Sequence, residues 1–230
     1  MSAPVPEPVA PVPEPVEGRW ITFEGGDGAG KTTQATLLEQ WLRAQGRTVV
    51  RTREPGGTAV GALIRDIVLH HPGDIAPRAE ALLYAADRAH HVATLVRPAI
   101  ARGEIVVQDR YLDSSVAYQG AGRVLDAAEV RDLSLWAAEG ALPDLTVLLD
   151  LDPASARVRL DADDKPFDRL EAEQSEFHAR VRQGFLELAA AEPDRFLVLD
   201  ATRPADELAA AVRERVAATD GSAGRVGRTP

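Results

Sequence analysis

The 230-residue sequence predicts an α/β fold in which helices cover both faces of a five-stranded, mostly parallel sheet. Two observations support this prediction. Short apolar segments alternate along the chain with longer segments of helical periodicity, as they do in repeated β–α–β units. The chain length and a hydrophobic content of 45% also suit one globular domain. In sheets of this kind, ligands bind beyond the carboxyl ends of the strands.

Each expected strand is a short apolar segment, and one or two helical segments follow it. The strands are expected at residues 20–23, 48–52, 105–108, 145–149 and 196–199. The helices are expected at residues 31–44, 59–69, 79–101, 114–119, 127–139, 153–160, 169–191 and 204–217. Because a helical crossover joins each strand to the next, neighbouring strands should run parallel.

Both ends of the chain are expected to lie outside the domain, which is placed at residues 19–218. Residues 1–18 contain the sequence PVPEPV twice and should form an extended, disordered proline-rich tail. This tail could bind an SH3-like partner, but a solvated extension is the favoured interpretation. Residues 219–230 are rich in glycine, carry little apolar content and are also expected to be disordered.

Composition excludes several classes of protein. With 26 Lys and Arg against 36 Asp and Glu, the net charge is −10, which argues against a nonspecific nucleic-acid binder. Cysteine is absent, so disulfides, thiolate metal sites and cysteine nucleophiles are impossible. Neither a secretory signal nor an apolar stretch of about 18 residues is recognisable. We therefore expect a soluble, cytoplasmic protein that binds neither nucleic acid nor a membrane.

The loop after the first expected strand reads GGDGAGKT and matches the P-loop pattern G-x-x-x-x-G-K-[ST]. Its glycines allow backbone N–H groups to surround phosphate oxygens, and the following helix adds its N-terminal dipole. Lys31 is expected to reach the β- and γ-phosphates, and Thr32 to bind Mg²⁺. Asp109, at the end of the third strand, can help to hold this ion. The predicted ATP-binding residues are Gly25, Gly26, Asp27, Gly28, Ala29, Gly30, Lys31, Thr32 and Thr33.

A P-loop identifies a nucleoside triphosphate but not a reaction. Two classes remain: a phosphotransferase with a second substrate, and a regulatory or motor NTPase. The chain contains no asparagine, so it lacks the Asn-Lys-x-Asp motif of guanine-reading GTPases. The third strand ends in Gln108-Asp109-Arg110-Tyr111 instead of the Asp-Glu that is usual in motor ATPases. The arginine there favours an anionic second substrate.

Four arginines lie where an anionic substrate would bind: Arg53, Arg88, Arg110 and Arg169. Guanidinium groups stay charged and bind phosphate through two hydrogen bonds. Arg53 and Arg110 follow expected strands and should lie at the ligand-binding edge. Tyr84 and Arg88 are four residues apart on one helical face. The ring could stack on a base while Arg88 holds a phosphate, although a buried core tyrosine beside an extended arginine is equally compatible.

Five segments, taken in chain order, resemble those of bacterial thymidylate kinases, which belong to the P-loop nucleoside monophosphate kinases. They read FEGGDGAGKTT (23–33), REPGGT (53–58), LLYAADR (82–88), DRYLDSSVAYQG (109–120) and DRLE (168–171). The resemblance implies a three-layer P-loop kinase fold with a lid, and transfer of the γ-phosphoryl group of MgATP to dTMP. It also implies a homodimer. The nearest alternative is a kinase for another nucleoside monophosphate.

The resemblance also implies roles for residues around dTMP. Asp27 matches the carboxylate at the sugar 3′-hydroxyl, and Arg53 and Arg110 match the arginines at the acceptor phosphate. Tyr84 matches the ring that stacks on thymine, and Arg88 is reassigned from phosphate to base. The expected substrate-binding residues are Asp27, Arg53, Glu54, Pro55, Tyr84, Arg88, Arg110, Ser114, Ser115, Tyr118 and Gln119.

Residues 153–171 match the lid over ATP. Family members without an arginine directly after the P-loop aspartate, where this chain has Gly28, take a catalytic cation from the lid. The candidates are Arg157, Arg159, Lys165 and Arg169, with Arg157 and Arg169 preferred. The expected catalytic set is Lys31, Asp27, Arg110, Arg157 and Arg169. The expected metal-binding set is Thr32, Asp109 and Glu171.

Overall fold

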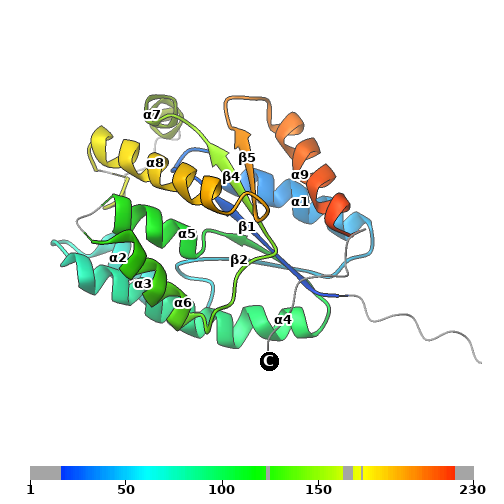
Figure 1. Cartoon of the computed structure of the whole chain (residues 1–230), viewed down its shortest axis with the longest axis horizontal. Helices are drawn as coiled ribbons and strands as arrows, with labels where there is room; N and C mark the ends of the chain where they lie inside the picture. Colours follow the sequence, from blue (N-terminus) through cyan, green and yellow to red (C-terminus); the bar gives the residue numbers. More distant parts are fainter. Residues whose placement is uncertain (1–16, 123–124, 163–167, 172, 221–230) are drawn as a thin grey trace, which may run out of the picture.

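The computed structural model describes residues 17–122, 125–162, 168–171 and 173–220. Its sheet has five strands: β1 (Arg19–Glu24), β2 (Val49–Arg53), β3 (Ile105–Asp109), β4 (Leu145–Asp150) and β5 (Phe196–Asp200). Their order is β2-β3-β1-β4-β5, and every pairing between them is parallel. The structure thus confirms the predicted five-stranded α/β sheet (Figure 1).

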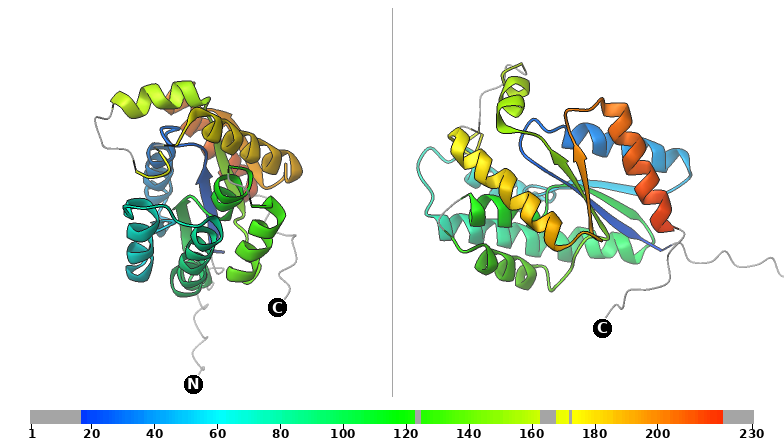
Figure 2. Two further views of the ribbon diagram at one scale, coloured as in Figure 1. Left: turned by 90° about the vertical axis from the view of Figure 1, so that its left-hand side faces the viewer. Right: turned by 45° about the horizontal axis from the view of Figure 1, so that its top comes forward.

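Helices cover both faces of this sheet, which gives three layers (Figure 2). The α-helices are α1 (Lys31–Ala44), α2 (Ala59–His70), α3 (Pro77–His91), α4 (Arg97–Ala101), α5 (Leu112–Ser115), α6 (Ala127–Ala137), α7 (Pro153–Ala162), α8 (Ser175–Ala191) and α9 (Ala205–Asp220). Two π-helical segments continue such helices: η1 (Val92–Val96) and η2 (Val116–Ala121). Within the described residues, no helix is both long enough and apolar enough to cross a membrane.

Alternating side chains of β1 connect the two outer layers. Ile21 and Phe23 are buried with residues of α1 and α9 on one face of the sheet. Trp20 points to the other face, into a cluster with residues of η1, α5 and α6. Since β1 is central in the sheet, the P-loop that follows it lies at the middle of the ligand-binding edge.

One helix boundary differs clearly from the prediction. The helix expected at residues 169–191 begins only at Ser175, and Arg169 lies in a turn. Asp168 Oδ1 accepts hydrogen bonds of 2.9 Å from the backbone N–H groups of Leu170 and Glu171, which closes a turn there. The backbone of Gln174 is extended (φ −70°, ψ 158°), so α8 begins only after it.

The predicted tails are described only at their inner ends. Residues 1–16 of the expected N-terminal tail and 221–230 of the C-terminal tail lie outside the described residues. Helix α9 continues to Asp220, so residues 219–220 are helical and the expected domain end at residue 218 falls inside this helix. Its alanine-rich sequence favours helix through this stretch.

Candidate active site

The P-loop joins β1 to α1 in a backbone conformation that requires its glycines. Gly25, Gly28 and Gly30 have positive φ angles of 130°, 76° and 94°. A Cβ atom on Gly25 would also lie only 2.4 Å from the carbonyl oxygen of Leu149. The buried Lys31 Nζ donates to the carbonyl oxygens of Gly25 (3.1 Å) and Gly26 (2.8 Å). The lysine is therefore held across the mouth of the loop, where a phosphate can displace these contacts.

A cavity that we call the P-loop cavity opens in front of this loop. Its lining consists of Asp27, Gly28, Gly30, Lys31, Thr32, Thr33, Arg53, Glu54, Arg65, Asp109, Arg110, Arg159 and Leu160. Thr32 Oγ1 donates to Asp109 Oδ2 at 2.9 Å. A hydroxyl and a carboxylate oxygen placed together suit Mg²⁺, which takes few protein ligands and otherwise binds water and phosphate. The described residues contain no group of three or more His, Asp or Glu side chains that could hold a metal ion.

A second cavity, the inner cavity, lies deeper between the P-loop and helices α2, α3 and α5. Its cavity volume is about 120 Å³. Of the residues expected around the acceptor, all except Arg53 line it. Arg53 instead lines the P-loop cavity, and Glu171, expected at the metal, lines the inner cavity. The two cavities are adjacent, because they share four lining residues: Asp27, Glu54, Arg65 and Arg110.

Arg110 lies at the junction of the two cavities. Its backbone has a φ of 63°, and its N–H donates to the carbonyl oxygen of Phe23 at 2.9 Å. One end of the guanidinium donates to Gly25 O and Ser114 Oγ, each at 3.1 Å. The other end donates to Asp27 and to the hydroxyl of Tyr118. The side chain is therefore aimed at the space between the P-loop and the inner cavity.

The charge of Asp27 is set by its neighbours. Burial opposes ionisation of Asp27, but Arg110 and Lys31 outweigh it and hold the pKa of this carboxyl well below its ordinary value. The hydroxyl of Tyr118 donates to Asp27 Oδ2 at 3.0 Å and adds to this effect. Asp27 is consequently an ionised hydrogen-bond acceptor at the boundary of both cavities.

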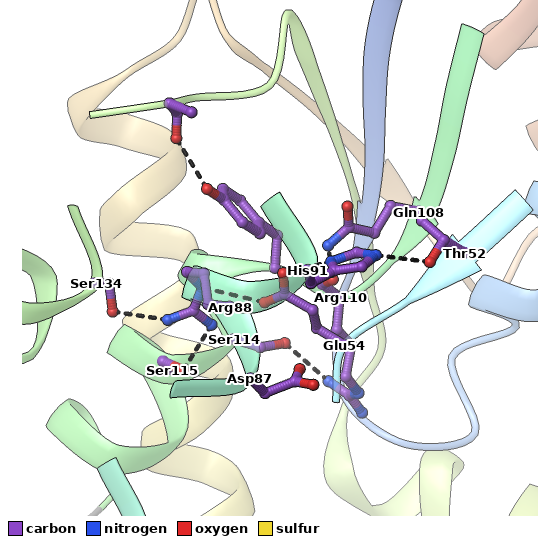
Figure 3. Close-up of polar contacts among 12 residues, drawn as sticks. Thr52, Glu54, Asp87, Arg88, His91, Gln108, Arg110, Ser114, Ser115 and Ser134 are labelled. Atoms are coloured by element: carbon purple, nitrogen blue, oxygen red, sulfur yellow. Dashed lines mark hydrogen bonds and ion pairs between the residues drawn. The ribbon is translucent and has the colours of Figure 1, made fainter. Parts of the chain in front are cut away.

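Arg88 closes the far end of the inner cavity and is 1% exposed. Its guanidinium donates to Glu54 (3.1 Å), Ser115 (3.0 Å) and Ser134 (3.0 Å), as Figure 3 shows. Tyr84 lines the same cavity, and burial raises the pKa of its phenol, which stays neutral. A neutral ring and a fixed guanidinium together can recognise a planar base through stacking and hydrogen bonds.

The lid arginines lie in three different places. Arg159 on α7 lines the P-loop cavity and donates to the carbonyl oxygens of Ala201 (2.8 Å) and Gly28 (3.4 Å). Arg157, one of the two preferred candidates, forms an exposed pair with Asp161 and lines a third cavity, between α7 and α8, that also touches Gly25, Gly26 and Asp27 of the P-loop. Arg169, the other, donates to Glu80 and to the carbonyl oxygen of Val68. Lys165 lies outside the described residues.

Sequence reasoning overlooked several residues of the site. Arg65 lines both cavities and donates to Pro55 O at 3.1 Å. Glu80 accepts from Gln119 at 2.9 Å and from Arg169, and Ser134 accepts from Arg88. Arg65 was recognisable as a cation on the helix that follows the REPGGT segment. Ser134 and Glu80 carry no local signal, because their partners are distant in sequence.

Comparison with known proteins gives consistent results. The model of the thymidylate kinase family matches residues 23–212. The chain is 73% identical to the thymidylate kinase of Leifsonia xyli subsp. xyli, over 86% of this chain and 94% of the relative. It is 55% identical to that of Bifidobacterium longum, over 87% and 98%. The solved thymidylate kinase of Ehrlichia chaffeensis is similar with a TM-score of 0.71 at 31% identity, over 87% of this chain and 99% of the other.

Proposed function

Because the chain belongs to the thymidylate kinase family, we propose that its P-loop cavity binds the phosphates of ATP and its inner cavity binds dTMP. The enzyme phosphorylates dTMP to dTDP with ATP as the donor. One observation carries the assignment of the two sites. The two cavities meet at Asp27 and Arg110, where a transferred phosphoryl group would contact both. Both substrates are intracellular nucleotides, so we place the enzyme in the cytoplasm.

The reaction needs positioning and charge neutralisation more than covalent chemistry. The acceptor phosphate of dTMP would lie against Arg110 and Arg53, with the sugar 3′-hydroxyl at Asp27 and thymine between Tyr84 and Arg88. Lys31 would move from the P-loop carbonyls to the β- and γ-phosphates. An oxygen of the acceptor phosphate is itself the nucleophile, so no general base is required. The cations lower the barrier because charge spreads over the γ-phosphoryl group in the transition state.

The donor set at the P-loop fits Mg²⁺. Thr32 and Asp109 would hold the ion, since their oxygens already lie 2.9 Å apart. When bound, Mg²⁺ supplies positive charge to the β- and γ-phosphates. Glu171 lines the inner cavity, and we therefore assign it to the acceptor side.

The wild-type enzyme should prefer dTMP over other monophosphates. We expect ADP release, measured with a coupled assay across dTMP, dUMP, UMP, CMP, AMP and GMP, to give the highest kcat/KM with dTMP. A fixed guanidinium and a stacking ring at one end of the cavity select a pyrimidine of defined shape. A higher kcat/KM with another monophosphate would identify that nucleotide as the acceptor instead of dTMP. An ATP hydrolysis rate that no monophosphate changes would indicate a regulatory NTPase.

We propose Arg159 as the lid cation, in place of Arg157 and Arg169. Its guanidinium lines the P-loop cavity, whereas Arg169 is engaged by Glu80. We expect Arg159→Ala to lower kcat about 100-fold, with KM for dTMP nearly unchanged, because one cation at the transferred group is lost. The measurement is steady-state kinetics with both substrates. A larger loss of kcat in Arg157→Ala than in Arg159→Ala would contradict this assignment.

The helices α2, α3 and α6 leave an apolar outer surface that we propose is covered by a second copy of the chain. Helix α3 packs against both α2 and α6, so the three form one continuous face (Figures 1 and 2). Large apolar side chains on it are exposed: Leu63 (70%), Leu82 (57%) and Trp136 (79%). Isolated surface leucines are common, but several on adjoining helices mark an interaction surface. A homodimer would bury them.

The oligomeric state can be tested with two variants at equally exposed positions. Leu63→Asp on α2 should shift the mass measured by light scattering from twice 24.7 kDa towards 24.7 kDa. A buried carboxylate without a partner strongly opposes association. Val158→Asp on α7 is the control, since Val158 is 71% exposed but lies off this face. A wild-type mass of 24.7 kDa, or an unchanged dimer in Leu63→Asp, would contradict the proposed interface.

A further inference from the structure

A chain of buried polar side chains runs from the end of β2 to the arginine at the base end of the inner cavity (Figure 3). Thr52 Oγ1 lies 2.7 Å from His91 Nε2, and His91 Nδ1 lies 2.8 Å from Glu54 Oε1. The other oxygen, Glu54 Oε2, accepts from Arg88 Nε at 3.1 Å. His91 and Arg88 are 0% and 1% exposed, and Glu54 is 4% exposed. Water therefore has little access to compete for these bonds.

The imidazole of His91 is fixed at both of its nitrogen atoms. The carboxylate of Glu54 is an acceptor, so His91 donates to it from Nδ1, and Nε2 faces the hydroxyl of Thr52. With one oxygen of Glu54 held by His91, the direction of the other oxygen is also determined. That second oxygen receives the Nε–H of Arg88.

The guanidinium of Arg88 is held by side chains from three segments. Glu54 follows β2, Ser115 ends α5 and Ser134 lies on α6. An arginine has five N–H donors, and these three bonds use three of them. The remaining donors can serve a ligand in the inner cavity, which Arg88 lines. Their direction depends on the plane of the guanidinium, and hence on Glu54.

The loop after β2 packs directly against this network. A Cβ atom on Gly57 would lie 2.5 Å from Thr52 Oγ1 and 2.7 Å from His91 Nε2. The glycine thus allows the backbone to approach the imidazole closely. The REPGGT segment and the pair Arg88 and His91 on α3 are therefore two halves of one buried cluster, although they are separated in sequence.

We propose that His91 is a positioning residue for the acceptor nucleotide: it orients Glu54, and Glu54 orients Arg88 towards the base. His91 touches neither substrate in this scheme, and its effect reaches dTMP only through Arg88. The inference rests on the proposed function of the inner cavity as the dTMP site. It predicts that the bond from Nδ1 to Glu54 determines acceptor binding, whereas the bond from Nε2 to Thr52 contributes less.

Two substitutions separate the two bonds of His91. Asparagine places its amide near the position of Nδ1 and can keep the bond to Glu54, whereas glutamine reaches the position of Nε2 and keeps only the contact with Thr52. We expect His91→Gln to raise KM for dTMP about tenfold, and His91→Asn to raise it no more than about threefold. KM for ATP should change less than about twofold in both, since ATP binds in the other cavity. The measurement is steady-state kinetics, with melting temperature recorded for each variant.

His90→Gln is the matched control, because His90 is the neighbouring residue of α3 and is outside the network; its kinetics should equal those of the wild type. If both His91 variants unfold, Thr52→Val provides a second test of the network. It removes one hydroxyl and keeps the shape of the side chain, so we expect it to fold. It should raise KM for dTMP about threefold at most.

Equal KM values for dTMP in folded His91→Asn and His91→Gln would overturn the inference, as would a tenfold rise of this KM in Thr52→Val. A wild-type enzyme that does not phosphorylate dTMP would instead overturn the proposed function.

Discussion

Replacing Lys31 with alanine is expected to lower kcat for dTMP phosphorylation about 1,000-fold, because it removes the cation that we propose binds the γ-phosphoryl group. In the structure, Nζ is buried and is held by the carbonyl oxygens of Gly25 and Gly26. Burial lowers the pKa of this ammonium group, and the nearby Arg110 lowers it further. Bound ATP phosphates would stabilise the charged ammonium group and offset this effect. Single-turnover kinetics at saturating ATP would measure the chemical step itself.

The position of the charge matters as much as the charge. Lys31→Arg keeps the charge, but its larger guanidinium does not fit between the loop carbonyls, so we expect it to restore little activity. Arg43→Ala removes an exposed cation from the other end of the same helix and serves as the control, with kcat near the wild-type value. A folded Lys31→Ala protein with kcat within tenfold of wild type would contradict this role.

The strands and the P-loop were predictable because their signals are local. Apolar segments of β1, β3 and β4 are continuous in sequence, and residues 25–32 carry the complete P-loop pattern between a strand and a helix. Helix α1 was predicted with both boundaries correct, since it begins directly after the P-loop. The predicted beginning of α8 was wrong, because the chain makes a turn at Asp168 and passes through an extended residue, Gln174, before the helix starts.

Hydrogen bonds between residues that are distant in sequence were not predictable in the same way. Arg159 reaches Gly28 and Ala201, and Arg169 reaches Glu80, across segments that the fold alone brings together. An arginine side chain is long enough to serve several sites from one backbone position, so its place in a motif does not fix its partner. Most of the expected acceptor residues line the inner cavity, but the resemblance to thymidylate kinases, and not their position on strand ends, indicated Ser114, Ser115, Tyr118 and Gln119.

Replacing Arg110 with alanine is expected to lower kcat/KM for dTMP about 1,000-fold, because its guanidinium lies where both cavities meet and would contact the transferred phosphoryl group in the proposed mechanism. Arg110 is also the main cation that depresses the pKa of Asp27. An acid with a lowered pKa in the folded protein stabilises it above the ordinary aspartate pKa, and this contribution is lost as the pH falls through the folded value. The variant should therefore also have a lower melting temperature at pH 7, while the difference from wild type should shrink in acid.

Two further variants separate charge from geometry at Arg110. Lysine keeps the charge but cannot bind Asp27 and a phosphate with separate nitrogen atoms, so Arg110→Lys should lose about 100-fold in kcat/KM. Arg102→Ala removes an exposed arginine paired with Glu104 and should leave the kinetics unchanged. Equal losses in the lysine and alanine variants would show that the forked geometry is essential. If kcat/KM of Arg110→Ala stays within tenfold of the wild-type value, Arg110 does not bind the acceptor phosphate, and this phosphate must bind elsewhere.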